Sequence, residues 1–230
     1  MLHIINRSNR HIYEAQIEQH HRIRYDIYVK TRGWNALDRP DGRELDDFDT
    51  EEATYLLAIE DGGNVVGGSR LVPSVYPHLL SEVFPHMASV AGLPRGPLIV
   101  EWTRYFVVPE RRNIGRACDL GGMIATGVYE HCLNEGYRTI TAIFETYWLT
   151  RLLEFGWHIQ TLGLPELIDG NWTIAAAIAV DRDGLDSVRA TWGIHGPILQ
   201  YHSGLAPLAQ PNAGSEADNS VRDKVAAGAK

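Results

Sequence analysis

An apolar strand that runs through a basic turn into a long helix limits the fold of this chain more than any other feature. Residues 98–108 form the apolar run, Pro109 ends it, and residues 115–134 have helical character up to Gly136. A second apolar run follows at 138–144. A strand, a helix and a second strand in this order predict a βαβ-like unit at the centre of a sheet.

The flanking segments add a hairpin and more helices. Two β-leaning runs at 54–60 and 64–72 enclose a Gly-Gly turn, which predicts an antiparallel hairpin. The other predicted helices are 12–31, 147–155 and 184–194, and the other predicted strands are 157–163 and 172–181. A short amphipathic piece lies at 79–84. We therefore expect an α/β fold of the α+β type, with one mostly antiparallel central sheet and helices on both faces.

The length of 230 residues suits one well-cored domain, which we place at 1–206. Residues 207–230 lack aromatic side chains and are rich in Ala, Gly, Asn and Ser, so we expect a disordered tail there. Cys118 and Cys132 fall in one predicted helix, roughly 21 Å apart, which is too far for a disulfide. Neither a disulfide nor a zinc site is expected.

The net charge of −8 argues against non-specific nucleic-acid binding, which needs a basic surface. No apolar run approaches the roughly 18–20 residues of a membrane span, and the first ten residues have no signal-peptide core, so we expect no membrane association and a cytoplasmic location. Acidic residues gather at 38–52 and arginines at 104–116. This separation predicts two different ligand environments.

The basic turn, Arg112-Asn113-Ile114-Gly115-Arg116-Ala117, directly precedes the long helix. Helix N-termini carry unpaired N–H groups and partial positive charge, so they bind phosphate, and Arg111, Arg112 and Arg116 add fixed charge. The turn resembles the acyl-CoA loop, Arg/Gln-x-x-Gly-x-Gly/Ala, of the GCN5-related N-acetyltransferase fold, which is a three-layer sandwich. The resemblance implies a pantetheine phosphate on this loop. The alternative is a solvated turn with ordinary helix capping.

Charged and aromatic residues in the first half of the chain form an ordered set. In chain order the set reads Arg24-Tyr25-Asp26-Ile27-Tyr28, Gly33-Trp34, Glu44-Leu45-Asp46-Asp47-Phe48-Asp49, Gly67-Gly68-Ser69-Arg70-Leu71 and Glu101-Trp102-Thr103-Arg104-Tyr105. In residue type, order and spacing it resembles the LuxI-type family of acyl-homoserine-lactone synthases, over roughly residues 1–195. Tyr28 departs from the Phe that is usual in that family but keeps the ring.

Elementary geometry already links these residues. Arg24 and Tyr28 are one helical turn apart and share a face. Glu101 and Arg104 project to opposite faces of a regular strand, whereas a twist or bulge could bring both into one cleft. The arginines and carboxylates together could form a buried ion network, which is costly unless its members are mutually paired. The alternatives are separate structural salt bridges and a solvated acidic loop.

The resemblance implies a two-step reaction. The amine of S-adenosyl-L-methionine attacks an acyl thioester, and the methionyl carboxylate then closes a lactone and expels methylthioadenosine. The sulfonium is its own leaving group, so neither a metal nor a further cofactor is required. The predicted catalytic residues are Glu101 as the first candidate base, Asp46 as the second, and Arg104 or Arg24 as the partner of the methionyl carboxylate. The predicted S-adenosyl-L-methionine-binding residues are Arg24, Tyr28, Trp34, Asp46, Asp49, Arg70 and Arg104.

The acyl thioester is expected in the second half of the chain. The predicted contacts are Phe84, Thr103, Phe106, Arg111, Arg112, Gly115, Arg116, Ile143, Phe144, Tyr147, Trp148 and Leu152. The bulky run at 143–148 would shorten an acyl pocket, although it could equally be ordinary core. The chain resembles the rhizobial-type branch that uses branched-chain or aryl acyl-CoA, such as isovaleryl-CoA. Acyl carrier protein remains an alternative donor and an alternative partner.

Two other functions fit part of the pattern. An N-acetyltransferase acting on another amine would use the same loop at 111–117 but would not need the ordered charged set. A non-catalytic sensor could bind an adenosyl or acyl ligand in the same cleft but would not need Glu101 as a base. Release of methylthioadenosine distinguishes the synthase from both alternatives.

Overall fold

The predicted central unit is present in the computed structural model, which describes residues 1–112 and 119–202. Strands β4 (Ile99–Val107) and β5 (Thr139–Glu145) are parallel neighbours, and helix α3 (Asp119–Asn134) lies between them in the chain. The predicted beginning of this helix at 115–118, with Cys118, and the predicted tail at 207–230 lie outside the described residues. Cys132, on α3, is a buried free thiol.

The strands form one mixed sheet in the order β6-β8-β5-β4-β3-β2-β1-β9, with β7 paired to β8. Only β4–β5 and β1–β9 are parallel among the described pairs, so the expectation of a mostly antiparallel sheet is confirmed. The remaining strands are β1 (Leu2–Ile5), β2 (Thr54–Ile59), β3 (Val65–Pro73), β6 (Ile159–Thr161), β7 (Glu166–Ile168), β8 (Asn171–Ala179) and β9 (Leu199–Tyr201).

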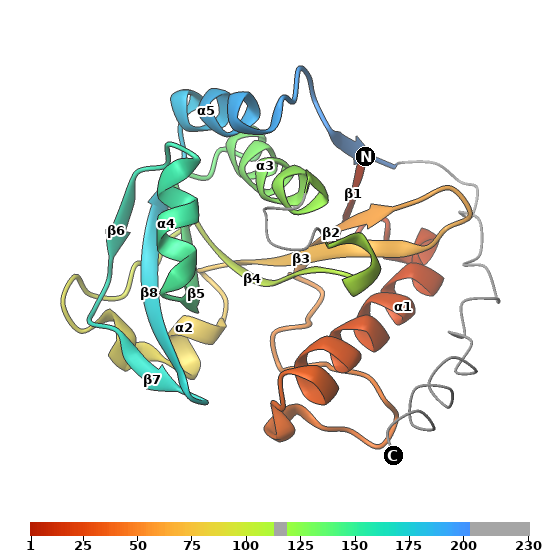
Figure 1. The fold of residues 1–230 in the computed structure, drawn as a ribbon, viewed down its shortest axis with the longest axis horizontal. Helices are drawn as coiled ribbons and strands as arrows, with labels where there is room; N and C mark the ends of the chain where they lie inside the picture. Colours follow the sequence, from red (N-terminus) through yellow and green to blue (C-terminus); the bar gives the residue numbers. More distant parts are fainter. Residues whose placement is uncertain (113–118, 203–230) are drawn as a thin grey trace, which may run out of the picture.

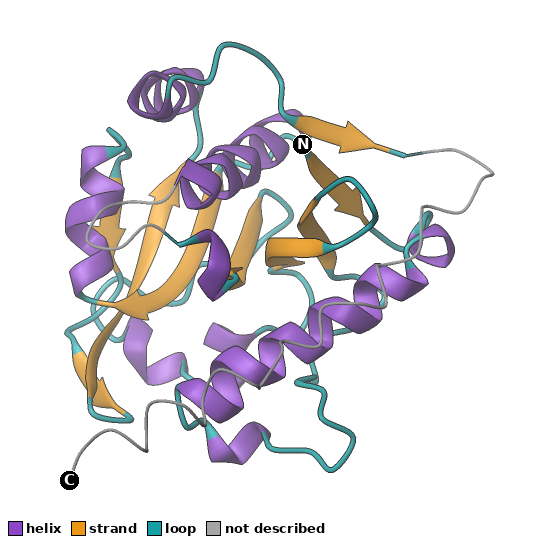
Figure 2. Cartoon of the chain, turned by 45° about the vertical axis from the view of Figure 1, so that its right-hand side comes forward, coloured by secondary structure: helices purple, strands orange, loops and turns teal. Residues whose placement is uncertain are grey.

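Helices cover both faces of this sheet (Figures 1 and 2). The face with α3 also carries α4 (Tyr147–Glu154) and α5 (Arg182–Trp192), and its core is centred on Trp102, Tyr129 and Trp157. The other face carries α1 (Glu14–Arg24), the π-helical turn η2 (Tyr25–Thr31) and α2 (Leu79–Glu82). Short 3-10 turns are η1 (Arg10–Ile12), η3 (Asn35–Leu37), η4 (Pro85–Ala88) and η5 (Pro109–Arg111).

Two predictions about local structure need correction. The helix expected at 12–31 is α-helical only to Arg24 and continues as the π-helical turn η2, because apolar spacing alone does not separate the two helix types. Strands β1, β7 and β9 were not expected. Each has three or four residues, and its pairing partner is set by the fold rather than by local sequence. Among the described helices, none is both long and apolar enough to cross a membrane.

Strands β4 and β5 separate along their length. Their last paired residues are Trp102 and Ala142, after which β5 continues only against β8, as far as Glu145 opposite Thr173. Strand β4 instead continues against β3 to Val107. The sheet therefore opens between β4 and β5 in its middle.

A β-bulge lies at this point in β4. Gly68 faces Phe106 and Arg70 faces Thr103, so β4 carries one more residue than β3 between the two pairs. Arg104, inside this interval, has φ of 53°, which is uncommon for a residue other than glycine. The bulge places the Arg104 side chain on the α1 face together with Thr103, which regular alternation would not do.

Candidate active site

Three arginines and three carboxylates meet under helix α1. Arg24 is the last residue of α1, Arg70 lies on β3 and Arg104 lies in the β4 bulge. Glu44, Asp46 and Asp49 come from the loop that joins η3 to β2. The six formal charges cancel, and the buried ion network expected from the sequence is present.

Asp49 lies at the closed end of this network. Its carboxylate receives Nη1 and Nη2 of Arg24 at 2.7 and 2.8 Å and also contacts Nη1 of Arg70 at 3.0 Å. The Tyr55 hydroxyl donates to it at 2.8 Å, and the backbone N–H of Asp46 donates at 3.0 Å. Both oxygens are therefore occupied by partners from the protein itself.

Arg104 and Asp46 form the other end. Arg104 donates to Glu44 through Nε and Nη2 at 2.9–3.2 Å, and Nη2 also reaches Asp46 at 2.7 Å. Glu44 accepts a short bond from Nε of Arg24, and Asp46 accepts two bonds from Arg70. Glu44 thus joins two arginines. It was not among the residues predicted for the site, although it lies in the acidic run that holds Asp46.

The network keeps Glu44 and Asp49 ionised. Burial alone would raise the pKa of Glu44, but Arg104 and Arg24 outweigh burial and lower that pKa to about 2. Burial also opposes ionisation of Asp49, and Arg70 and Arg24 hold its pKa well below the ordinary range. Tyr55 shows the opposite shift, because burial and the neighbouring Asp49 raise the pKa of its hydroxyl.

Only one end of the network reaches solvent. The side chains of Arg24, Arg70, Glu44 and Asp49 are at most 1% exposed, whereas those of Asp46 and Arg104 are 10% and 6% exposed. A ligand arriving from solvent therefore meets Asp46 and Arg104 first. The other four members hold these two in place.

An aromatic pair stands beside Arg104. Tyr28 and Trp34 are stacked, with ring centroids 4.9 Å apart and an interplanar angle of 12°. The Arg104 guanidinium lies 5.6 Å from the Tyr28 ring and 5.9 Å from the Trp34 ring. The Tyr28 hydroxyl donates to the carbonyl of Tyr105 at 2.9 Å, which fixes the pair against the bulge. Ring faces at this position suit a cationic group.

Glu101 lies on the same sheet face but has different partners. Its carboxylate accepts the backbone N–H groups of Leu79 and Leu80, at 2.9 and 2.6 Å, and so caps the start of α2. The side chain is fully buried, and burial raises its pKa despite these N–H donors and the nearby His78. A raised pKa suits a general base, but both oxygens already accept hydrogen bonds.

Four of the residues predicted for the thioester, Thr103, Phe106, Ile143 and Phe84, lie on β4, on β5 or just after α2. Ile143 and Phe84 belong to the cluster under α2, and Thr103 accepts a bond from Arg70 at 3.1 Å. Phe106 is buried with its ring 5.5 Å from His20. The bulky side chains of residues 143–148 do not all face the same side of the sheet.

The rest of that run faces elsewhere. Phe144 and Leu152 pack into the core below α4, and Tyr147 is largely exposed. The Trp148 ring contacts the Tyr105 ring edge-on at 5.5 Å. These contacts are ordinary packing around α4.

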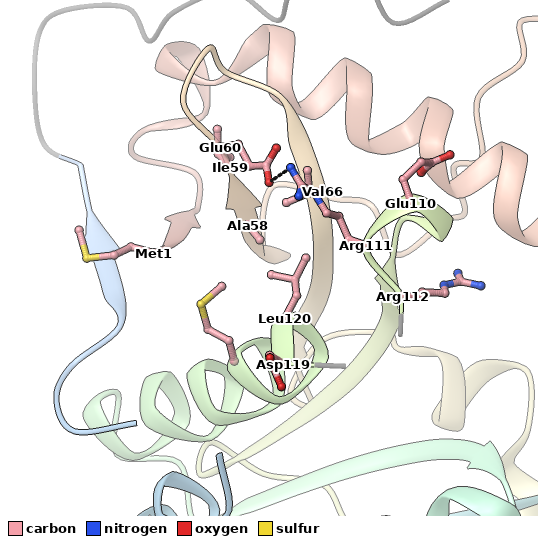
Figure 3. A pocket seen from close by; sticks show the side chains of 11 residues that line it. Met1, Ala58, Ile59, Glu60, Val66, Glu110, Arg111, Arg112, Asp119 and Leu120 are labelled. Carbon is pink, nitrogen blue, oxygen red and sulfur yellow. Dashed lines mark ion pairs between the residues drawn. The ribbon is translucent and has the colours of Figure 1, made fainter. Parts of the chain in front are cut away.

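Arg111 and Arg112, the described residues at the start of the predicted phosphate loop, lie beside a hollow of about 490 Å³ (Figure 3). Arg111 and Arg112 border it, and Arg111 reaches Glu60 at 2.5 Å, while Arg112 donates to the carbonyl of Val107 at 2.8 Å and points away. Gly115 and Arg116 lie outside the described residues. The part of the loop that the structure describes therefore supplies two guanidiniums near this hollow.

No group of three or more His, Cys, Asp or Glu side chains that could hold a metal ion occurs within residues 1–112 and 119–202. The acidic side chains of the network contact guanidiniums instead of each other.

The sequence model of a protein family described as autoinducer synthase matches residues 8–188. The chain belongs to the autoinducer synthase family. The resemblance to LuxI-type acyl-homoserine-lactone synthases is thereby confirmed, as is the expectation of an acyltransferase enzyme.

Individual relatives extend this result. The isovaleryl-homoserine lactone synthase of Bradyrhizobium diazoefficiens is 47% identical over 212 residues, which cover 92% of this chain and 94% of the relative. A solved CoA-dependent acyl-homoserine lactone synthase, BjaI, with SAM and isopentyl-CoA, superposes with a TM-score of 0.83 at 45% identity, covering 90% of this chain and 95% of that one.

A more distant likeness concerns the fold alone. An acyl-CoA N-acyltransferase structure from Pseudomonas aeruginosa matches with a TM-score of 0.53 at 14% identity, over 77% of this chain and 99% of that one. The expected likeness to the N-acetyltransferase sandwich is confirmed.

Replacement of Glu44 by Gln should destabilise the fold by about 3–5 kcal/mol, because it leaves Arg24 and Arg104 buried with one carboxylate too few. Urea unfolding measures this change. Glu51→Gln is the matched control, since Glu51 pairs with Arg7 at 3.1 Å while both side chains are more than half exposed, and it should change stability little. Equal stability of the two variants would show that the network is not a structural unit.

Glu44 should also make stability depend on pH. Its pKa is lowered from 4.5 to about 2, so its stabilising effect is complete above pH 4.5 and is lost as the pH falls through 2. The size of this effect is on the order of 3 kcal/mol. Urea unfolding between pH 5.5 and 3 should show a steeper loss of stability in the unmodified protein than in Glu44→Gln. Parallel pH profiles would contradict the assignment.

Proposed function

We propose that this enzyme makes a branched-chain acyl-homoserine lactone from S-adenosyl-L-methionine and an acyl-CoA, with isovaleryl-CoA as the favoured donor. The observation that carries the proposal is the neutral ion network, which presents one carboxylate and one guanidinium beside an aromatic stack. The close relatives named for isovaleryl-homoserine lactone and for CoA dependence support the choice of donor.

The network suits the charges of S-adenosyl-L-methionine. Its ammonium and sulfonium are cationic, and its carboxylate is anionic. Asp46 would receive the ammonium, Arg104 the carboxylate, and the faces of Tyr28 and Trp34 the sulfonium or adenine. Arg24, Arg70 and Asp49, expected from the sequence to bind this substrate, would act by fixing Asp46 and Arg104, because their own side chains are at most 1% exposed.

The reaction then needs two bond exchanges. The amine loses a proton and forms a C–N bond to the thioester carbonyl, and the C–S bond breaks as coenzyme A leaves and takes up a proton. The methionyl carboxylate next forms a C–O bond to its own γ-carbon, and the C–S⁺ bond breaks to give neutral methylthioadenosine. An α-amino group has a pKa of about 7.7–8.0, so a modest base suffices for the first proton.

Glu101 and Asp46 remain the two candidate bases. Glu101 has the raised pKa that a base needs, but the N–H groups of Leu79 and Leu80 occupy its oxygens. Asp46 is closer to solvent but is engaged by Arg70 and Arg104. We favour Glu101, acting directly or through a water molecule.

The opening between β4 and β5 is the natural place for the thioester, because both strand edges there lack a strand partner and offer backbone groups. Ile143 and Phe84 would meet the acyl group, and Thr103 and Phe106 would border its carbonyl end. Arg111 and Arg112, with Gly115 and Arg116, would receive the phosphates of coenzyme A. Side chains as large as Ile143 and Phe84 favour a short or branched acyl group.

Both substrates are cytoplasmic metabolites, so we propose that the enzyme acts in the cytoplasm. Coenzyme A rather than acyl carrier protein is the proposed carrier. No further cofactor enters the proposed reaction, because the sulfonium supplies the leaving group.

The purified protein, given S-adenosyl-L-methionine and isovaleryl-CoA, should release coenzyme A and methylthioadenosine together and form isovaleryl-homoserine lactone. Mass spectrometry of all three products checks this. An aryl-CoA, octanoyl-CoA and octanoyl-acyl carrier protein complete the panel. Turnover only with the carrier protein would overturn the proposed donor, and coenzyme A release without any methylthioadenosine would overturn the lactone-forming reaction.

Replacement of Glu101 by Gln should lower kcat by about 10²- to 10⁴-fold if this carboxylate takes the amine proton. Steady-state release of methylthioadenosine measures the loss, and circular dichroism checks that α2 remains folded. Turnover close to that of the unmodified enzyme would remove Glu101 as the base and leave Asp46.

A further inference from the structure

We propose that an ion pair between Arg32 and Glu145 positions the two substrates relative to each other and so protects the thioester from water. This inference rests on the proposed function, since it concerns the same site. Neither residue belongs to the charged set from which the site was predicted. Both lie outside the buried network.

Glu145 is held on the far side of the β4–β5 opening. It is the last residue of β5, three positions beyond Ala142, where pairing with β4 ends. Its backbone is fixed because it faces Thr173 on β8. Its carboxylate accepts Nη1 of Arg32 at 2.5 Å, although 113 positions separate the two residues in the chain.

Arg32 is held on the near side. It directly follows the π-helical turn η2, and its backbone N–H donates to the carbonyl of Ile27 at 3.0 Å. Its guanidinium lies 6.0 Å from the Tyr28 ring and 5.8 Å from the Trp34 ring. The same group therefore contacts Glu145 and the aromatic pair that is proposed to hold S-adenosyl-L-methionine.

These contacts form a continuous connection across the opening. Arg104, in the β4 bulge, also contacts the Tyr28 and Trp34 rings, and the Tyr28 hydroxyl is fixed to the Tyr105 carbonyl. The connection runs from the β4 bulge through the two rings to Arg32 and then to the end of β5. It sets the separation between the aromatic pair and the wall on which the acyl group is expected.

The pair is better shielded than an ordinary surface salt bridge. The Arg32 and Glu145 side chains are 37% and 18% exposed. Lys30 and Asp26 form an ion pair on the adjoining turn η2, and their side chains are 65% and 61% exposed. Burial lowers the pKa of Arg32, but Glu145 outweighs it and raises that pKa overall. Shielded charges with fixed backbones hold geometry better than mobile exposed ones.

Loss of this connection has a specific chemical consequence. If the amine moves away from the thioester carbonyl, water competes for the same carbon. Water then forms the C–O bond, the C–S bond breaks, and a carboxylic acid and coenzyme A are released without methylthioadenosine. Small displacements of reacting groups are costly in rate, so the partition between amine and water reports the alignment.

The test compares Glu145→Gln and Arg32→Gln with the control Asp26→Asn, which removes the neighbouring exposed ion pair. The quantity measured is methylthioadenosine formed per coenzyme A released, with isovaleryl-CoA and saturating S-adenosyl-L-methionine. Each test variant should lower this ratio by about three- to tenfold. The ratio of the double variant should be no lower than that of the more strongly affected single variant, because the two residues act as one unit. Asp26→Asn should keep the ratio of the unmodified enzyme.

An unchanged ratio in both test variants, or effects that multiply in the double variant, would overturn the proposal. Failure of the proposed function itself looks different, because the unmodified enzyme would then form no methylthioadenosine from any thioester. Thermal unfolding of each variant separates a change in alignment from a general loss of stability. A lowered ratio in a fully folded variant supports the positioning role.

Discussion

Three guanidiniums buried under one helix are the constraint on which this site depends. An ionised side chain removed from water costs several kcal/mol unless charges and hydrogen bonds replace its hydration. Arg24 and Arg70 are fully buried, so the chain must supply carboxylates at the same depth. The loop that carries Glu44, Asp46 and Asp49 supplies them. This loop has little regular structure of its own, so ion pairs fix its conformation.

The ion network explains why a loop can serve as one wall of an active site. Asp49 is surrounded by protein partners and anchors the loop, whereas Asp46, three residues earlier, reaches the surface. The bulge in β4 adds Arg104 from the other side. A regular strand would turn Arg104 toward α3, so the positive φ of this residue is a local strain that the surrounding ion pairs stabilise.

Much of this architecture could be predicted from sequence. The βαβ centre, the hairpin and the clustering of Arg24, Arg70 and Arg104 with acidic residues follow from apolar spacing and from the order of charged motifs. The possibility that a bulge would bring Arg104 and Glu101 to one face was foreseen, and both do lie on the α1 side. The pairing of Arg104 with Glu44 was not foreseen, because Glu44 has no spacing signal that separates it from its acidic neighbours.

Other features depend on contacts that sequence patterns do not carry. The π-helical turn after Arg24 has the same apolar spacing as an α-helix, so the sequence does not reveal it. This turn positions the following residues Arg32 and Trp34, whose backbone N–H groups donate back to it. The hydrogen bonds from Leu79 and Leu80 to Glu101 join segments that are more than twenty residues apart. The packing of the bulky run at 143–148 was the least predictable, since its residues face different layers once β5 passes into α4.

A crystal structure of the enzyme with S-adenosyl-L-methionine tests the central claim most directly, because it shows which charges the substrate contacts. The account predicts that Asp46, Arg104 and the Tyr28–Trp34 pair touch the ligand, while Arg24, Arg70 and Asp49 keep the ion pairs described above. A ligand carboxylate bound directly by Arg24 or Arg70, with their pairs to Asp49 broken, would contradict it.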